Sequence, residues 1–573
     1  MNSPAEPKVQ DTQTKRRVPA YEVLAQDIKN LGVEAVFGLM SDDTALFVTA
    51  LDMAGISFHG ARHENTAITM AEGYSAASGS LGVAVVGRGP ATANGLHAAV
   101  YASRTGSQVL IIYGDAAVPG GALNSLGPDY KAFNAQGVLS AAGLQVFWAS
   151  SARSSRTTLL DAVNAAQLGN AVALLLPTSV QLTEIEEEDS QSDRPILSPA
   201  PSETARPHAV KAAVELLRDH RNPLIIAGIG AYRSGARDAL EGLAEQLGAL
   251  LLTTARGREM FRGHPYNLGI IGSFTHSTAR HYIDQADCVL VFGASLNFWT
   301  TSFGSSIPDV PLIQVDASRT HIGKYYSADV ALVGDARLVA EQLSAALPVR
   351  SEDDKPFHSS QTRKSIADHD LASDFTAAHT ARTVDPRSLG IALDELLPEN
   401  RNLVYDAGNF LGIVPYISVP GPDHFKMTNN FASIGLGFGA ALGFARARRE
   451  ATTVLLVGDG GFMMTIGELE TVVREDLPLI IAVINDCAYG AELHFLRIHQ
   501  RPVETSLFPD VDFAPIAEGF AFEAATIRSI DDLQKMAPIL KDPQGPILLD
   551  CKVNADVAGA FMTELAAFES GED

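Results

Sequence analysis

Short apolar runs alternate with amphipathic stretches along the whole chain. In the first third, Val83–Val86 and Val109–Tyr113 have the pattern of buried strands, and Thr66–Ala77 and Ala91–Ala102 have the pattern of helices. Strands that are apolar at nearly every position are typical of parallel sheets covered by helices on both faces. The pattern therefore predicts an α/β fold for this part of the chain.

The same alternation recurs in the middle and last thirds of the chain. Helices are predicted near Gly235–Leu247 and at Ile466–Glu475. The predicted strands are Pro223–Ala227, Cys288–Phe292 and Pro311–Val315 in the middle third, then Val454–Val457, Leu479–Ile484 and Pro546–Leu549 in the last third. We expect three doubly wound parallel-sheet domains.

Two segments interrupt this rhythm and are interpreted as linkers. Residues 184–207 begin with an acidic run and continue with prolines and serines, and residues 349–387 are dense in charge, serine and histidine. The predicted organisation is a disordered N-terminal arm (1–17), a first domain (18–185), a central domain (206–349), a third domain (386–560) and a C-terminal tail (561–573).

Composition narrows the classes of protein to which the chain can belong. A net charge of −24 disfavours nucleic acid and anionic membranes as partners. The chain has three cysteines, Cys288, Cys487 and Cys551, too few and too scattered for a disulfide framework or a zinc site. There is no apolar run of membrane-spanning length, and the polar N-terminus does not resemble a secretory signal. These features predict a globular cytoplasmic protein.

The stretch from Val454 to Gly490 carries the most informative motif. One predicted strand ends in Gly458-Asp459-Gly460-Gly461, and the next ends in Asn485-Asp486. Asp459 and Asp486 are 27 residues apart in the chain, yet in a βαβ unit both emerge at the carboxyl edge of the sheet, where open α/β sheets bind ligands. Carboxylate oxygens suit Mg²⁺, and glycines let a diphosphate approach the backbone. The alternative is a simple turn followed by an ordinary loop.

Together with Ala488-Tyr489-Gly490, this spacing resembles the signature of thiamine diphosphate enzymes, in which Gly-Asp-Gly is followed, one helix and one strand later, by Asn-Asn. The resemblance implies that Asp459, Asp486 and the backbone carbonyl of Ala488 bind Mg²⁺. The chain departs from the family pattern at Asp486, where asparagine is usual. The resemblance also implies cofactor contacts from Gly408, Asn409, Ile434, Gly458, Gly460, Gly461, Tyr489 and Gly490.

A second part of the resemblance centres on Glu64, in Arg62-His63-Glu64-Asn65. Read alone, Glu64 is an acid at a helix N-terminus, where the helix dipole favours it. The following Ala71-Glu72-Gly73-Tyr74-Ser75 and Gly89-Pro90-Ala91-Thr92-Ala93-Asn94 are similar to family motifs. The resemblance implies that Glu64 holds the cofactor's pyrimidine ring, as proton removal from the thiazolium requires, with Pro90 and Asn94 beside it.

The resemblance covers nearly the whole chain and implies the three-domain fold of that family, with pyrimidine-binding, central and diphosphate-binding domains. It also implies a homodimer whose active sites lie at the subunit interface, and it leaves a tetramer open. The central domain carries FAD in some members. Here Gly228-Ile229-Gly230 does not fit the dinucleotide spacing, so we do not expect FAD and favour a structural role for these glycines.

Positions expected near the substrate are unusual for the family. Asp42 and Asp43 occupy the place of small residues or a histidine, and they are either acid–base groups on the substrate or a helix N-cap before Thr44. Asn134 aligns with a glutamine beside the thiazolium. Ile434 takes the place of the bulky residue that holds thiamine in its bent shape, or is an ordinary core isoleucine.

The favoured function is a carbon–carbon lyase or carboligase acting on small carbonyl substrates, namely 2-keto acids, aldehydes or 2-hydroxy ketones. Gly467-Glu468-Leu469-Glu470-Thr471 and Ala491-Glu492-Leu493-His494-Phe495 are similar to benzaldehyde lyase segments. The alternatives are an acetolactate synthase, a 2-keto acid decarboxylase and a non-catalytic homologue that binds the cofactor. The adjacent-histidine pair of pyruvate decarboxylases is missing, which disfavours simple pyruvate decarboxylation. An NAD-dependent dehydrogenase rests on the α/β pattern alone.

Overall fold

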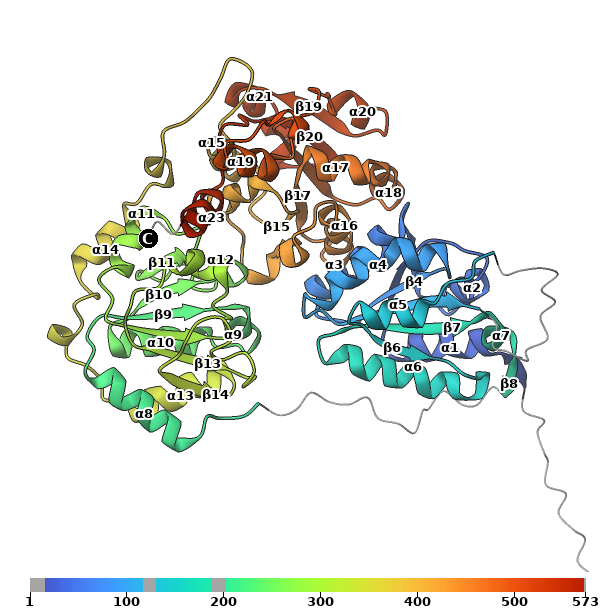
Figure 1. The fold of residues 1–573 in the computed structure, drawn as a ribbon, viewed down its shortest axis with the longest axis horizontal. Coiled ribbons are helices and arrows are strands. Elements are labelled where there is room, and N and C mark those ends of the chain that lie inside the picture. The colour runs from blue at the N-terminus through green and yellow to red at the C-terminus, as the bar shows by residue number, and fades with distance from the viewer. Residues whose placement is uncertain (1–15, 117–129, 187–201, 571–573) are drawn as a thin grey trace, which may run out of the picture. The chain divides into compact units, whose positions relative to one another are not determined.

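The computed structural model describes residues 16–116, 130–186 and 202–570. Within these residues lie three six-stranded sheets, each made of parallel strands and each belonging to a different third of the chain (Figure 1). The chain divides into two compact units, of which the first holds the N-terminal sheet and the second holds the other two. The expected α/β class with three parallel-sheet domains is confirmed.

The N-terminal sheet has the strand order β3-β2-β4-β5-β7-β6. Helices cover both of its faces (Figure 1), which explains why Val83–Val86 and its neighbours are apolar throughout. The short β1 (Arg17–Pro19) pairs antiparallel with β8 (Glu184–Glu186). The strands are β2 (Ala35–Gly38), β3 (Ser57–Gly60), β4 (Gly82–Val86), β5 (Val109–Asp115), β6 (Gln145–Trp148) and β7 (Ala171–Pro177). The helices are α1 (Ala20–Asn30), α2 (Ala45–Met53), α3 (Glu64–Ser78), α4 (Pro90–Ser103), α5 (Ala135–Ala141), α6 (Ala152–Gln167) and α7 (Thr178–Leu182).

The central sheet has the order β11-β10-β9-β12-β13-β14. Alternate residues of β9 enter two different cores: Ile225 packs with α8, α10 and α13, while Leu224 packs with α11 on the opposite face. The strands are β9 (Pro223–Ala227), β10 (Leu250–Thr253), β11 (Asn267–Ile270), β12 (Cys288–Phe292), β13 (Leu312–Asp316) and β14 (Val330–Val333). The helices are α8 (Pro207–Arg218), α9 (Ile229–Arg233), α10 (Arg237–Leu247), α11 (Ser277–Ile283), α12 (Phe298–Thr301) and α13 (Ala336–Ala346).

The C-terminal sheet has the order β16-β15-β17-β18-β20-β19, which places β17 and β18 side by side. Its strands are β15 (Arg401–Tyr405), β16 (Phe425–Met427), β17 (Thr452–Gly458), β18 (Leu479–Asn485), β19 (Glu523–Ile527) and β20 (Ile547–Lys552). Its helices are α15 (Pro386–Leu396), α16 (Gly437–Ala447), α17 (Asp459–Thr465), α18 (Leu469–Arg474), α19 (Gly490–Ile498), α20 (Ala514–Glu518), α21 (Ile530–Lys535), α22 (Ala537–Lys541) and α23 (Ala560–Ser570), and 3₁₀ turns include η5 (Asn409–Tyr416), η7 (Asn429–Phe431) and η8 (Ile466–Glu468).

Two segments differ from the expected linkers and tails. Residues 349–387 contain helix α14 (Ser360–Ala367), and Phe357 is buried against the central sheet while His358 stacks on Tyr266. A few apolar and aromatic side chains therefore anchor a segment whose average composition is polar. The expected tail, 561–573, begins within α23, where Phe561 is buried in the C-terminal core.

Other expectations fall partly outside the described residues. The predicted N-terminal arm, residues 1–17, is described only at Arg16 and Arg17, and Arg17 begins β1. The first linker is described at its two ends, β8 and residues 202–207. None of the helices in the described part of the chain combines the length and the apolar character needed to cross a bilayer.

The central and C-terminal domains of the second unit are joined by a buried arginine. Arg258, 2% exposed, donates hydrogen bonds to the carbonyl oxygens of Val414 (2.8 Å) and Ile417 (2.7 Å). Its guanidinium also lies over the ring of Phe425, 4.9 Å from the centroid. An arginine suits this position because its several planar donors satisfy two carbonyls at once.

Candidate active site

Two aspartates meet at the carboxyl edge of the C-terminal sheet. Asp459 follows β17 and begins α17, and Asp486 follows the neighbouring β18, because Gly458 lies opposite Ile484 in the parallel register. Asp459 is 6% exposed, and the two side chains share a hydrogen bond. Burial and then the Asp486 carboxylate raise the pKa of Asp459 to about 8, and burial raises the pKa of Asp486 to about 6. The pair therefore carries charge that a cation would stabilise.

Glycines keep the space around this pair narrow but open. A side-chain carbon at Gly490 would lie 2.2 Å from Asp486 Oδ2 and 3.1 Å from Asn409 Cβ. One at Gly460 would lie 2.7 Å from the ring of Tyr489. A side chain at either position would therefore displace a neighbouring side chain. Glycine avoids this and leaves room for a ligand to approach the backbone. Gly458, Gly460, Gly461, Tyr489 and Gly490 are thus brought to one edge.

The segment after Asp486 is held in a tight turn. The N–H of Ala488 donates to Asp486 Oδ1 (3.2 Å), and Ala488 pairs with Leu507 in an antiparallel bridge. Cys487 has a φ of 55°, a conformation that is uncommon for residues other than glycine. The turn holds the backbone of Ala488 against the carboxyl group of Asp486, which contacts Asp459.

Gly408 and Asn409 follow β15 at the same edge of the sheet. The side chain of Asn409 forms hydrogen bonds with the backbone just before helix α23. Its side-chain Nδ2 donates to the carbonyl of Val557 (3.0 Å), and its Oδ1 accepts the N–H of Gly559 (2.8 Å). Asn409 thereby ties the start of the C-terminal helix α23 to the candidate site. This contact was not foreseen from the sequence.

A third aspartate, Asp406, was missed by the sequence analysis. It directly follows β15 and is fully buried, and it accepts hydrogen bonds from the N–H groups of Gly435 (2.6 Å) and Gly437 (3.1 Å) and from Thr428 Oγ1 (3.0 Å). Burial raises its pKa. Asp406 therefore fixes the turn that carries Ile434. The available signal was a polar residue directly after a buried strand, as at Asp459.

Ile434 is half-buried and lies beside the glycine turn. Its Cβ is 3.5 Å from the position that a side chain on Gly461 would take, and its Cδ1 is 3.8 Å from the corresponding position on Gly460. Its partial exposure at this edge differs from the full burial of an ordinary core isoleucine. The structure thus places Ile434 beside the glycines that directly follow Asp459.

In the first unit, Glu64 begins α3 and is 7% exposed. Its Oε2 accepts a hydrogen bond from Asn94 Nδ2 (3.2 Å). Pro90 occupies the first turn of α4, where its missing N–H costs nothing. Helices α3 and α4 therefore bring Glu64 and Asn94 into contact, while Pro90 lies one turn before Asn94 on α4.

Asp42 and Asp43 form a charge cluster with two cations. Asp43, 8% exposed, accepts hydrogen bonds from Arg88 Nε (2.9 Å) and Lys131 Nζ (3.0 Å). Lys131 also donates to Asp42 and, through that bond, lowers the pKa of Asp42. Helix α2 begins at Ala45 with Thr44 as its N-cap, and no side chain caps it. The N-cap alternative for these two aspartates is therefore wrong.

Asn134 has a structural role that the sequence analysis did not consider. It is the N-cap of α5, and its side-chain oxygen accepts the N–H of Gly137 (2.9 Å). Asparagine is among the best residues at this position. Its side chain is exposed and its oxygen is occupied by this bond, and within residues 16–116 and 130–186 no hydrogen bond joins it to Glu64.

The glycines of the central domain serve backbone packing. A side-chain carbon at Gly228 would lie 2.2 Å from the carbonyl oxygen of Gly293, and one at Gly230 would lie 2.9 Å from Gly293 Cα. The N–H groups of Gly228 and Gly230 donate to Phe292 and Gly293. These contacts join the ends of β9 and β12 at the point where the strand order reverses, and they account for the Gly-Ile-Gly motif without a dinucleotide.

The residues at the C-terminal edge fit a magnesium-bound diphosphate. The two carboxylates and the Ala488 carbonyl are hard oxygen donors of the kind that Mg²⁺ prefers. Burial raises the pKa of both carboxyl groups, and the charge of Asp486 raises that of Asp459 further, so a bound cation would favour the ionised pair. The glycines at 460, 461 and 490 keep side chains out of the adjacent space.

Comparison with protein-family models gives three matches in chain order. Residues 19–131 match the "Thiamine pyrophosphate enzyme, N-terminal TPP binding domain". Residues 210–343 match the central domain of the same enzymes, and residues 406–551 match the "C-terminal TPP binding domain". The three matched segments correspond to the three parallel sheets.

Similar curated proteins extend over nearly the whole chain. A probable acetolactate synthase large subunit from Methanocaldococcus jannaschii is 27% identical over 93% of this chain and 91% of its own length. A probable 2-ketoarginine decarboxylase from Pseudomonas aeruginosa is 27% identical over 93% and 94%, respectively. The mouse 2-hydroxyacyl-CoA lyase 1 is 24% identical over 94% and 95%. Their names cover a synthase, a decarboxylase and a lyase.

Proposed function

The chain belongs to the thiamine pyrophosphate enzyme family, and we propose that within it the protein is a Mg²⁺-dependent carbon–carbon lyase or carboligase acting on small carbonyl substrates. The observation that carries the proposal is the hydrogen-bonded contact between the carboxyl groups of Asp459, which is buried, and Asp486, which is half-buried. Two such groups side by side require a proton or a cation. Mg²⁺ suits a site made of oxygen atoms alone. In this family Mg²⁺ also holds the diphosphate of the cofactor.

Each residue of the site has a separate task in this proposal. Asp459, Asp486 and the Ala488 carbonyl would hold Mg²⁺, and the glycine turn would admit the diphosphate. Glu64, already oriented by Asn94, would hydrogen-bond the aminopyrimidine ring. Ile434 would pack against the body of the cofactor. When bound, thiamine diphosphate supplies a carbon acid that adds to carbonyl carbons and stores the electrons released by carbon–carbon cleavage.

Binding of the cofactor tests the first part of the proposal. Calorimetric titration of the metal-free protein with thiamine diphosphate in the presence of Mg²⁺ should give saturable binding, whereas NAD should give none. Omitting Mg²⁺ should weaken the binding of thiamine diphosphate strongly, because the acidic edge repels the diphosphate. Absence of Mg²⁺-dependent binding contradicts the proposal.

Glu64→Gln tests catalysis separately from binding. Loss of the acidic proton should lower turnover by about 10²–10⁴-fold and change Mg²⁺-thiamine diphosphate affinity much less. The control is Glu22→Gln, because Glu22 is also an acid in the first turn of a helix but is exposed. Binding without any turnover of 2-hydroxy ketones, 2-keto acids or aldehydes would instead identify the non-catalytic alternative.

The direction of the reaction can be separated with paired substrates. Cleavage of an aromatic 2-hydroxy ketone to two aldehydes supports the lyase, which the segments 467–471 and 491–495 favour. Formation of acetolactate from pyruvate supports the synthase, and release of CO₂ from a 2-keto acid without carboligation supports the decarboxylase. The relatives at 24–27% identity include all three kinds of name.

We also propose that the protein is a homodimer whose two copies contribute Glu64 and Asp459 to shared sites. Exposed apolar side chains could form part of such an interface: Met40 is 55% exposed beside Asp42, and Met463 and Met464 are 51% and 61% exposed on α17, the helix that Asp459 begins. Mixing inactive Glu64→Gln and Asp459→Asn chains should restore about a quarter of the activity, since half of the dimers regain one intact site. No recovery after subunit exchange would overturn the shared site.

A further inference from the structure

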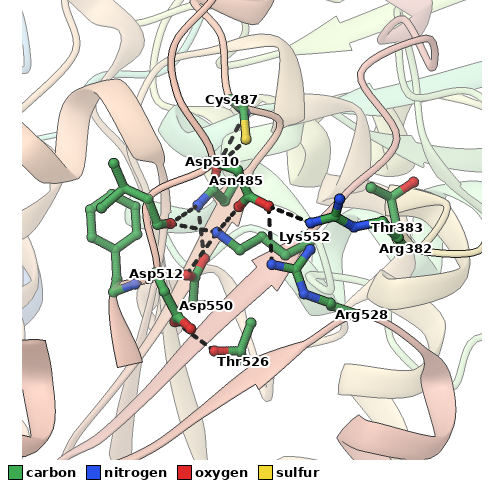
Figure 2. Close-up of polar contacts among 12 residues, drawn as sticks. Arg382, Thr383, Asn485, Cys487, Asp510, Asp512, Thr526, Arg528, Asp550 and Lys552 are labelled. Atoms are coloured by element: carbon green, nitrogen blue, oxygen red, sulfur yellow. Dashed lines mark hydrogen bonds and ion pairs between the residues drawn. The ribbon is translucent and has the colours of Figure 1, made fainter. Parts of the chain in front are cut away.

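A charged cluster centred on a buried lysine lies beside Asn485 and Cys487 (Figure 2). We call residues 485–488 the metal loop. The centre of the cluster is Lys552, the last residue of β20, which lies opposite Asn485 in the parallel register. Lys552 is 1% exposed. Lysine is almost never buried to this degree unless it is paired, so its partners identify what it does.

Three oxygen atoms take up the ammonium group of Lys552. Its Nζ lies 2.7 Å from Asp510 Oδ1 and 3.0 Å from Asp550 Oδ2, and it donates to the carbonyl of Val511. An ammonium group has three donors, so all three have partners. Asp510 is held in turn by Arg382 (3.2 Å) and Arg528 (3.0 Å), whose guanidinium groups converge on it in Figure 2.

Asp550 connects Lys552 to the metal loop. It is fully buried, and its Oδ1 accepts a hydrogen bond from Asn485 Nδ2 (2.9 Å). The other end of the same amide, Asn485 Oδ1, accepts the N–H of Cys487 (3.2 Å) and lies 3.4 Å from its Sγ. Cys487 directly follows Asp486, whose carboxyl group contacts Asp459. Its φ of 55° needs support from outside the loop.

The charges explain why a lysine belongs here. Asp550 is removed from water, and a buried carboxylate without a cation is costly. The family's usual second asparagine is an aspartate in this chain, so the neighbourhood already carries Asp459 and Asp486. Burial raises the pKa of Asp550, while the Lys552 ammonium lowers it and so favours the carboxylate form that accepts a hydrogen bond from Asn485. This acceptor determines which way the amide of Asn485 points.

We propose that Lys552 is a positioning residue for the metal loop, acting through Asp550 and Asn485 to hold Cys487 and thereby Asp486 and Ala488 in the metal-binding geometry. The inference rests on the proposed function for the identity of the metal. The chain of contacts that carries it lies wholly within the C-terminal domain.

The test is Lys552→Met, which keeps the length of the side chain and removes its charge. The affinity of the metal-free protein for Mg²⁺ and thiamine diphosphate, measured by calorimetry, should fall by about 10–100-fold, as for other residues that orient metal ligands. Alkylation of Cys487 by iodoacetamide in the absence of metal should become about 10-fold faster as the loop opens more often. Cys288 and Cys551 are at most 1% exposed, so Cys487 gives the early signal.

The matched control is Lys535→Met. Lys535 is also paired with an aspartate, Asp532 (2.8 Å), but its side chain is 73% exposed on α21. Exposed pairs contribute little, so Mg²⁺ affinity and Cys487 alkylation should match the wild type. A double-mutant cycle then tests the route: if Lys552 acts through Asp550, Asp550→Asn with Lys552→Met should weaken Mg²⁺ binding no more than Asp550→Asn alone.

The proposal is overturned if Lys552→Met leaves both Mg²⁺ affinity and Cys487 alkylation within twofold of wild type, whatever happens to the melting temperature. If that variant does not fold, Asp510→Asn removes only the outer partner of Lys552 and should give smaller changes of the same sign, with no change overturning the proposal. The alkylation assay needs no cofactor. A wild type that fails to bind Mg²⁺ and thiamine diphosphate would therefore contradict the proposed function, while alkylation would still decide the role of Lys552.

Discussion

The two outer domains each place a pair of aspartates at the carboxyl edge of a parallel sheet, and the two pairs are balanced differently. Asp42 and Asp43 in the N-terminal domain are bound by Lys131, and Asp43 also by Arg88. Asp459 and Asp486 in the C-terminal domain have each other as closest partners, and their pKa values are raised to about 8 and about 6. The first pair is neutralised by the protein, whereas the second requires a proton or an added cation.

The sheet itself does not create this difference. Numbered along the chain within each domain, both sheets have the same strand order, 2-1-3-4-6-5. What differs is the side chains that the neighbouring loops deliver: a lysine and an arginine in one domain, glycines in the other. The same topology thus carries a closed ion cluster in one domain and a proposed open metal site in the other. The presence or absence of cationic side chains beside the aspartates makes the difference.

The largest expected effect comes from removing one carboxylate of the open pair. Asp459→Asn should weaken Mg²⁺-dependent binding of thiamine diphosphate by more than about 100-fold, because a first ligand matters more than the residues that orient it. Asp43→Asn, the corresponding change in the closed pair, should leave that affinity unchanged. Calorimetry on both variants measures the two affinities. Equal losses of affinity would show that Mg²⁺-dependent cofactor binding depends on both aspartate pairs alike.

The pH dependence of the open pair follows from its raised pKa values. The folded protein holds protons on Asp459 and Asp486 that the unfolded chain releases near pH 4, so the contribution of this pair to metal-free stability is fully present below about pH 4 and is lost as pH rises through about 6 and about 8. Mg²⁺ replaces these protons, so its affinity should rise by about 10-fold or more between pH 6 and pH 8. Melting curves with and without Mg²⁺ should diverge with increasing pH, and a constant Mg²⁺ effect across this range would refute the raised pKa values.

A smaller effect is expected from filling the space beside Asp486. Gly490→Ala would place a carbon 2.2 Å from Asp486 Oδ2, so the carboxylate must move and Mg²⁺ affinity should fall by about 10-fold. Gly467→Ala is the control, because nothing lies within 4 Å of its side-chain position. Thermal melting should show both variants folded, and calorimetry should distinguish them. Unchanged Mg²⁺ affinity in Gly490→Ala would mean that Mg²⁺ binding does not depend on the present position of the Asp486 carboxylate.

The sequence contains enough information for the strands and for the meeting of the two aspartates. Runs such as Leu479–Ile484 are apolar at every position and therefore predict buried strands. Consecutive strands of a βαβ unit end at the same edge of the sheet, which predicts that the two aspartates meet. The pairing of β17 with β18 follows this rule. Glu64 and Asn94 were placed together only by the family resemblance, because helix packing brings them into contact.

Asp406 and Lys552 could not be identified in the same way. Each matters because of a neighbour that is distant in the sequence: Asp406 accepts the N–H groups of Gly435 and Gly437 at the start of α16, and Lys552 faces Asn485 because β20 lies between β18 and β19. The charged segment 349–387 was interpreted from average composition, which hides the few residues that anchor it. The N-cap role of Asn134 depends on where α5 begins, a boundary that patterns locate poorly.

The smallest expected effect is in the closed pair, and it concerns stability alone. Arg88→Met removes one of the two cations that hold Asp43, while Lys131 and the Arg88 N–H remain in contact with the carboxylate. The cost should be about 1–2 kcal/mol, below the 3–5 kcal/mol of a buried charge left wholly without a partner. Chemical denaturation should show this loss, and Mg²⁺ affinity should not change.

The control is Arg237→Met, which breaks an exposed pair with Glu241 and should cost less than about 0.5 kcal/mol. A fall in Mg²⁺ affinity on losing Arg88 would mean that the closed cluster also serves the metal site, and the separation between the two pairs would no longer hold.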